Sequence, residues 1–231
     1  MSVCDNVQRL RENIAAECAA CGRPPDTLRV MAVSKFQPVS RIAEAYAAGL
    51  RLFGESRVQE ACGKLDGRGA AFPGAEFHMI GSLQRNKAKT AAVLFDCVQS
   101  VDRDELIAAL GKYAAARAAP LAVLLELNAG EASKSGYKTT DALFGAMEAA
   151  LAWPYLAVRG LMTMAPLSRS SADAARAFAA LRTAREALRA RFGALELPVL
   201  SMGMSGDYKA AIREGSTLLR IGTAIFGEGG A

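Results

Sequence analysis

Short apolar segments alternate with helical patterns along this chain of 231 residues. Near-continuous apolar runs predict strands at residues 28–33, 50–53, 76–80, 95–100, 120–127, 155–162, 197–201 and 218–221. Strands of this kind are buried on both faces, which is typical of a parallel sheet whose strands are connected by helices. Eight such units in a chain of this size predict an α/β fold, a closed (β/α)8 barrel (a TIM barrel), in preference to an open doubly wound sheet.

An extra helix is predicted before the first strand. Val3, Val7, Leu10 and Ile14 recur at helical spacing, which indicates an amphipathic helix. Along the chain we find no linker, low-complexity stretch or charge block that would mark a boundary. We therefore expect residues 1–231 to form one domain.

Two short motifs are interpreted as helix ends. Asp102 and Glu105 have the spacing of a capping box, which predicts the start of a helix. Cys18 and Cys21 have the spacing of redox and half-zinc motifs, but the sequence has no second pair and a single histidine, His78. We therefore favour packing at the end of the N-terminal helix for the two cysteines. His78 lies within an expected strand, where a hydrogen-bonded packing role is the favoured interpretation.

Composition excludes several classes of protein. Hydrophobic residues make up 52% of the sequence, but no run of about 18 apolar residues predicts a membrane span. The N-terminus lacks a basic start followed by an apolar core, so no secretory signal is expected. Five cysteines without regular spacing suit a reducing compartment, which favours a cytoplasmic location.

The charge of the chain favours a small anionic ligand. The formal net charge is +5, but the basic residues are scattered and aromatic residues make up only 6%. Nucleic-acid interfaces usually cluster their basic residues on one face. We therefore expect neither nucleic acid nor a membrane as a partner.

Two glycine-bearing turns lie where barrels of this type bind phosphate. The site of a (β/α)8 barrel lies at the C-terminal ends of its strands, and the loops after the last two strands often hold a phosphate. Each turn alone is ordinary turn chemistry, but together they offer glycine backbone, hydroxyl groups and a fixed cation for a phosphate ester. The candidate ligands are Ser201, Ser205, Arg220, Gly222 and Thr223.

Lys35 is the candidate nucleophile. It follows the first apolar run directly, so we expect its amine to point into the mouth of the barrel, in partly desolvated surroundings. Desolvation and a nearby Arg220 would lower the pKa of the amine and free it to attack an aldehyde. The alternative is a lysine at a strand end that merely extends into water.

Several segments of the sequence resemble the pyridoxal phosphate homeostasis proteins, also called the proline synthase co-transcribed type. The resemblance covers nearly the whole chain, and its last segment is highly specific. The matching segments are residues 32–35 (AVSK), 53–60 (FGESRVQE), 77–87 (FHMIGSLQRNK), 133–136 (SKSG), 159–162 (RGLM), 200–207 (LSMGMSGD) and 220–227 (RIGTAIFG).

The resemblance implies a barrel like the N-terminal domain of alanine racemase, with pyridoxal 5′-phosphate (PLP) held as an aldimine on Lys35. It also implies that Arg220 faces the pyridine nitrogen, which disfavours protonation of the ring and weakens the cofactor as an electron sink. The residues implied for the phosphate are Ser201, Ser205, Gly222 and Thr223.

Members of the resembled family act as carriers or regulators of the cofactor pool. The resemblance therefore implies a non-catalytic protein of PLP homeostasis, with PLP-dependent apo-enzymes as potential recipients, and no catalytic residues or metal. The family usually has asparagine where this chain has Ser56, which leaves a contact near the cofactor in question. Whether Lys134 serves as a second acceptor stays open, and we expect a monomer because a closed barrel has no edge to cover.

Two enzymatic alternatives use the same barrel. A PLP-dependent amino-acid racemase needs a second proton donor opposite the lysine, which in alanine racemase-like enzymes is a tyrosine from a separate C-terminal domain. The printed sequence ends at Ala231, four residues after Gly227, so we do not expect such a domain. A Schiff-base aldolase or isomerase acting on a phosphosugar would also use Lys35, but it does not match the specific motifs.

Overall fold

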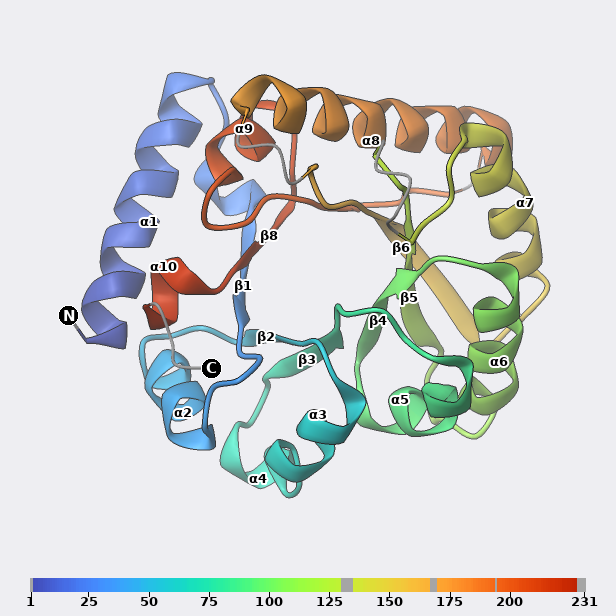
Figure 1. Cartoon of the computed structure of the whole chain (residues 1–231), viewed down its shortest axis with the longest axis horizontal. Helices are drawn as coiled ribbons and strands as arrows, with labels where there is room; N and C mark the ends of the chain where they lie inside the picture. The colour runs from blue at the N-terminus through green and yellow to red at the C-terminus, as the bar shows by residue number, and fades with distance from the viewer. Residues whose placement is uncertain (1, 130–134, 167–169, 194, 228–231) are drawn as a thin grey trace.

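A computed structural model describes residues 2–129, 135–166, 170–193 and 195–227. In this part of the chain, eight parallel strands pair in chain order and β8 pairs with β1, so that the sheet closes into a barrel (Figure 1). This closure confirms the predicted fold. The strands are β1 (Arg29–Val33), β2 (Leu52–Glu55), β3 (Glu76–Met79), β4 (Cys97–Val101), β5 (Leu121–Glu126), β6 (Leu156–Met162), β7 (Val199–Ser201) and β8 (Leu218–Ile221).

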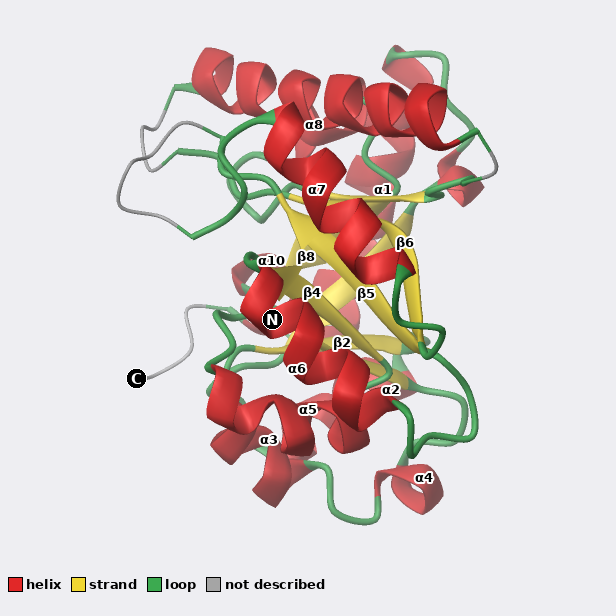
Figure 2. Ribbon diagram, turned by 90° about the vertical axis from the view of Figure 1, so that its right-hand side faces the viewer, coloured by secondary structure: helices red, strands yellow, loops and turns green. Residues whose placement is uncertain are grey.

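Helices surround the barrel on all sides (Figure 1), and the strands cross between two helical layers in the side view of Figure 2. None of the helices in the described ranges is long and apolar enough to cross a lipid bilayer. The α-helices are α1 (Val3–Ala20), α2 (Val39–Ala47), α3 (Val58–Lys64), α4 (Arg68–Ala71), α5 (Ala88–Leu94), α6 (Asp104–Ala114), α7 (Thr140–Leu151), α8 (Ser171–Phe192), α9 (Tyr208–Arg213) and α10 (Thr223–Phe226), with short 3-10 turns at η1 (Pro25–Thr27) and η2 (Arg85–Lys87).

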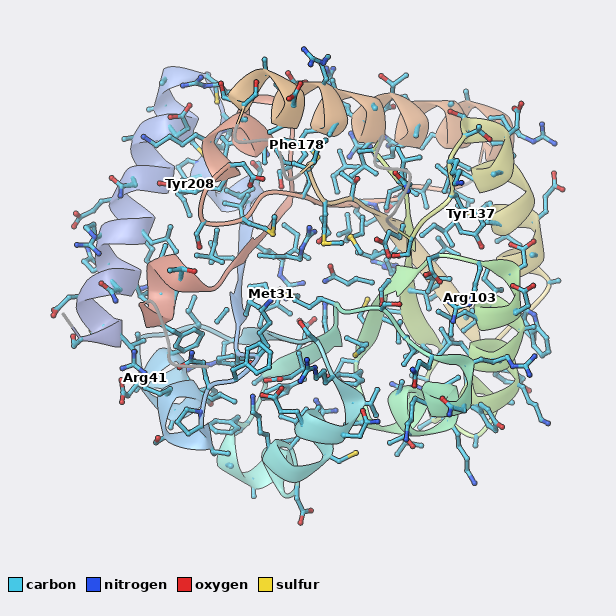
Figure 3. The ribbon with its side chains drawn as sticks, in the orientation of Figure 1. Met31, Arg41, Arg103, Tyr137, Phe178 and Tyr208 are labelled. Carbon is cyan, nitrogen blue, oxygen red and sulfur yellow. The ribbon has the colours of Figure 1, made fainter. Side chains whose placement is uncertain are left out.

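The main hydrophobic core lies between the strands and the helices. Phe178 of α8 and Tyr208 of α9 belong to this layer, whereas Met31 lies toward the centre of the barrel (Figure 3). Met31 packs with Leu52 and Leu218 in a separate apolar cluster. The interior is thus a packed core, as barrels of this size require.

The N-terminal helix α1 confirms the predicted extra helix and supports the last element of the barrel. Its four recurring apolar residues are buried. The side chain of Asn6, also buried, donates a hydrogen bond of 2.9 Å to the carbonyl of Ile225 in α10. Ser2 and Asp5 form a capping box at the start of the helix. Helix α1 therefore fixes α10, the element that follows β8.

Of the two short motifs interpreted as helix ends, the capping box is wrong and the packing of the cysteines is confirmed. The capping box predicted at Asp102 is wrong, because α6 begins only at Asp104 and no side chain caps its start. The Asp102 carboxylate instead accepts a hydrogen bond from Arg103, so it is not available to the helix backbone. Cys18 is buried in the main core and Cys21 follows the end of α1, which confirms the packing prediction.

Candidate functional site

A cavity of about 510 Å³ lies at the carboxyl ends of the strands. Five of the six predicted site residues line it, although one lies in β8 and the others follow β1, β7 and β8. Because the carboxyl ends of parallel strands meet at one mouth of a barrel, residues distant in sequence converge there. The five are Lys35, Ser205, Arg220, Gly222 and Thr223.

Ser201, the sixth predicted residue, lies below the cavity. It is fully buried at the end of β7. Its hydroxyl donates a hydrogen bond of 2.6 Å to Oε1 of Gln99 and accepts one of 2.7 Å from Nη1 of Arg220. The prediction placed Ser201 among the phosphate ligands, and the structure instead places it behind Arg220. The single proton of the hydroxyl is already used, so Ser201 has none to donate to a phosphate.

Arg220 is held rigidly at the floor of the cavity. Its side chain is buried, and Nη2 donates a hydrogen bond of 2.7 Å to the carbonyl of Thr163 in addition to the bond from Nη1 to Ser201. Burial lowers the pKa of the guanidinium to about 10, against the opposing effect of the nearby carboxylates Glu126 and Asp207. The group therefore stays charged at neutral pH, with further N–H donors beyond the two already bonded.

Lys35 lines the cavity but is exposed to solvent. It lies in a turn, two residues beyond the end of β1, and its Nζ is 5.9 Å from the ring centroid of Phe36. The predicted partly desolvated surroundings are therefore wrong. The physical reason is that the strand ends at Val33, so that the lysine belongs to the turn at the mouth and not to the barrel wall.

The backbone on both sides of Lys35 is clamped by charged side chains. Nζ of Lys64 donates a hydrogen bond of 2.8 Å to the carbonyl of Ser34, on one side of Lys35. On the other side, the backbone N–H of Phe36 donates one of 2.6 Å to Oε1 of Glu60. These bonds fix the position of the Lys35 turn relative to α3.

The clamp is completed by Glu55, whose side chain is fully buried. Its Oε1 accepts a hydrogen bond of 2.6 Å from the hydroxyl of Ser34, and Lys64 lies 3.2 Å away. Burial raises the pKa of the Glu55 carboxyl, and the Ser34 hydroxyl and Lys64 oppose that shift. Sequence reasoning missed this clamp, although the spacing of Glu60 and Lys64 on α3 is that of a helical ion pair.

Phe36 has a left-handed backbone, with φ of 62°. Glycine adopts this conformation readily, but it is unfavourable for a bulky residue such as phenylalanine and often marks a functional position. The Glu60 carboxylate that binds the N–H of Phe36 compensates for part of this cost. The turn that carries Lys35 is thus held in a strained form by its neighbours.

The remaining predicted phosphate ligands lie around the start of α10. The hydroxyl of Ser205 accepts a hydrogen bond of 3.2 Å from the backbone N–H of Ala224 and keeps its own proton for another acceptor. Gly222 has φ of −107°, and a Cβ there would have its nearest neighbour, in Val33, at 3.6 Å. The backbone of Gly222 therefore does not require glycine.

One position that lines the cavity relates to a point left open by the sequence. Ser56, which stands where the resembled family usually has asparagine, lines the cavity and is half-buried. Gly81 packs against it so closely that a Cβ at Gly81 would lie 2.2 Å from the Ser56 carbonyl oxygen. Lys134 lies outside the residues that the structure describes.

Comparison with known proteins agrees with this geometry. The family model for the alanine racemase N-terminal domain matches residues 6–229. The pyridoxal phosphate homeostasis protein of Vibrio alginolyticus is 40% identical over 229 residues, which are 98% of this chain and 97% of that protein.

Comparison with solved structures also points to this family and this fold. PipY of Synechococcus elongatus, in its structure with PLP bound, has a TM-score of 0.81 and 36% identity, and the match covers 93% of this chain and 100% of that chain. Alanine racemase of Bacillus anthracis has a TM-score of 0.71 at 14% identity, over 99% of this chain and 57% of that chain, which shows the shared fold alone. With a near full-length relative at 40% identity and the same barrel, this chain belongs to the pyridoxal phosphate homeostasis protein family.

Proposed function

We propose that this protein binds pyridoxal 5′-phosphate in the cavity at the carboxyl ends of the strands, and that it stores or delivers the cofactor without turnover of its own. The observation that carries the proposal is that Lys35, Arg220 and the two turns that contain Ser205 and Thr223 line one cavity. The cavity volume of about 510 Å³ is within the usual range for small-ligand sites.

The residues around the cavity fit each part of the cofactor. Lys35 supplies an amine for the aldehyde: a carbon–nitrogen double bond forms between Nζ and the aldehyde carbon, and water leaves. Ser205 and Thr223 offer hydroxyls to the phosphate, and Gly222 lets the phosphate approach the backbone. Arg220 supplies a charged donor for the pyridine nitrogen.

Arg220 also supports the absence of turnover. A guanidinium donates hydrogen bonds and accepts none, so it binds the pyridine nitrogen in its unprotonated form. PLP supplies enzymes with an electron sink, and that sink is weaker when the ring nitrogen is not protonated. A site built around Arg220 therefore suits retention of the cofactor better than demanding carbanion chemistry.

The test is the absorption spectrum of purified protein incubated with PLP. Wild type is expected to show the visible band of the imine, and Lys35→Ala to lose it. Lys89→Ala, at an exposed position on α5, is the matched control and is expected to keep the band. An undiminished band in Lys35→Ala would refute the assignment of Lys35.

Racemase activity is the alternative use of this barrel. The structural likeness to alanine racemase is at 14% identity and shows the fold alone, so it does not favour that activity. We expect no racemisation of a panel of amino acids by the PLP-loaded protein. Robust turnover that disappears in Lys35→Ala would establish the enzyme instead. PLP-dependent apo-enzymes are the recipients that the proposal requires, and it requires neither nucleic acid nor a membrane.

A further inference from the structure

A line of hydrogen bonds runs through the barrel interior away from Arg220. Ser201 of β7 joins Nη1 of Arg220 to Oε1 of Gln99 in β4, at 2.7 and 2.6 Å. Nε2 of Gln99 lies 2.8 Å from Nδ1 of His78 in β3. Nε2 of His78 lies 3.3 Å from Oε2 of Glu76, which pairs at 2.7 Å with Arg29 near the amino ends of the strands. The line thus connects the proposed cofactor site to the opposite mouth of the barrel.

The two ends of this line fix the direction of every hydrogen bond in it. Arg220 has only donors, so the Ser201 hydroxyl must accept from it and donate its one proton to Gln99. The Gln99 oxygen is then the acceptor for Ser201, which leaves the amide N–H₂ to face His78.

The same reasoning sets the tautomer of His78. Its Nδ1 must accept from the Gln99 amide, so the ring proton lies on Nε2 and is donated to Glu76. Glu76 can take it, since the hydrogen bond from His78 and the contact with Arg29 lower the pKa of its carboxyl to about 2. Every donor in the line therefore points from Arg220 toward Glu76.

The middle of the line is shielded from water. Gln99 and Ser201 are fully buried, and Arg220 and His78 are 4% and 6% exposed. Apolar side chains of the interior include the cluster of Cys97, Leu124 and Met162. Leaving a buried donor or acceptor without a partner costs more free energy than the hydrogen bond itself contributed. Reversing or breaking one hydrogen bond of the line is therefore unfavourable.

We propose that His78 and Gln99 are positioning residues that hold Arg220 in place for the pyridine ring. The proposal rests on the proposed function, because its consequence is the contact between Arg220 and PLP. Neither residue touches the cofactor cavity. Both line a second cavity, of about 500 Å³, that also includes Arg29 and Glu76.

Nitrogen NMR tests the line first without PLP and then with it, because His78 is the single histidine in the sequence. In the wild-type protein at neutral pH, the imidazole is expected to carry its proton on Nε2, with Nδ1 unprotonated. Addition of PLP is expected to shift the Nδ1 resonance, because Arg220 then shares its donors with the ring. A proton on Nδ1, or a resonance that does not move on binding, would overturn the proposal.

Variants test the effect on the cofactor. Gln99→Glu places a carboxylate oxygen opposite Nδ1, so His78 must take up a proton or lose the bond. His78→Leu removes the acceptor, and His78→Asn can restore it with its amide oxygen. We expect Gln99→Glu and His78→Leu to shift the imine band and to weaken PLP binding about threefold to tenfold, the worth of one hydrogen bond, with recovery in His78→Asn.

The control is Cys97→Ala, which alters the same second cavity outside the line. It is expected to leave the band and the affinity unchanged. Unaltered spectra and affinity in both Gln99→Glu and His78→Leu would overturn the positioning role alone. A wild-type protein with no imine band at all would instead overturn the proposed function, while the tautomer would still report on the line of hydrogen bonds.

Discussion

At the scale of single residues, the cavity combines groups that have different structural roles. Arg220 is fixed by its neighbours Ser201 and Thr163, and Lys35 is held through the backbone on either side. Gly222, in contrast, has an ordinary backbone and room for a methyl group in the structure as described. It can therefore be changed without disturbing the fold.

Gly222→Ala separates binding from folding. The nearest atom to the added Cβ would be in ordinary contact, at 3.6 Å, so the free energy of unfolding is expected to change by less than about 0.5 kcal/mol. Because Gly222 lines the cavity, the added methyl group should take space proposed for the phosphate and weaken PLP binding about tenfold or more.

Equilibrium unfolding in urea and titration with PLP measure the two effects. Gly145→Ala, a helix position where a Cβ meets nothing within 4 Å, is the control for PLP binding; in urea it should be more stable by up to about 1 kcal/mol, because alanine favours a helix more than glycine does. Undiminished PLP affinity in Gly222→Ala would show that the phosphate lies elsewhere.

At the scale of elements, two helices support the site from outside the barrel. Helix α1 holds α10 through the bond from Asn6 to the Ile225 carbonyl. Helix α3 holds the Lys35 turn through Glu60 and Lys64, which bind the backbone of Phe36 and Ser34. The mouth of the barrel is thus braced at β1 and at β8, the two strands whose pairing closes the sheet.

Lys64→Met tests the bracing by α3. The change removes the donor to the Ser34 carbonyl and leaves the buried Glu55 carboxylate without its cation. Breaking a buried pair in this way is expected to lower the free energy of unfolding by about 3 kcal/mol and to weaken PLP binding. Adding Glu55→Gln should recover part of the loss, because the unpaired charge is then gone.

Urea unfolding of these variants gives the comparison, with Lys112→Met, at an exposed position on α6, as control. If Lys64→Met is as stable as Lys112→Met, the clamp does not hold the turn.

At the scale of the whole molecule, a (β/α)8 barrel was predictable because each strand is an apolar run of its own, followed by a helix. The rule that barrels bind ligands at the carboxyl ends of their strands then selected five residues of the cavity. The inward position of Ser201, the clamp around Lys35 and the line through His78 were not predictable in this way. They depend on side chains from different strands, such as Gln99 and Ser201, that meet only when the barrel closes.

The line through the barrel also affects stability in acid. The pKa of Glu76 is lowered from 4.5 to about 2 in the folded protein, first by the hydrogen bond from His78. The contribution of the Glu76 carboxylate to the free energy of unfolding is therefore complete above pH 4.5 and is lost as the pH falls toward 2. Glu76→Gln should be less stable than wild type at pH 7, by less than about 1 kcal/mol because the side chain is 45% exposed, and this difference should shrink at pH 3.

Urea midpoints at the two pH values measure this loss. Glu196→Gln, at an exposed position before β7, is the control. Its difference in stability from wild type should be the same at pH 7 and pH 3. A gap between wild type and Glu76→Gln that grows in acid would have the wrong sign for this account.

We also expect the protein to be a monomer. Closure of the sheet leaves none of the eight described strands with a free edge to pair with another copy, and exposed large apolar side chains such as Phe36, Val93 and Tyr155 come from separate parts of the fold. Light scattering should give a mass near 24.3 kDa, and a mass of twice that value would refute the expectation.

The central claim is that Lys35 holds the cofactor through its amine. Borohydride reduction of the PLP-loaded wild-type protein fixes the bond, and mass spectrometry of its peptides then locates the pyridoxyl group. The account predicts the group on Lys35, in the peptide that follows β1. A pyridoxyl group found on another lysine, with Lys35 unmodified, would contradict it.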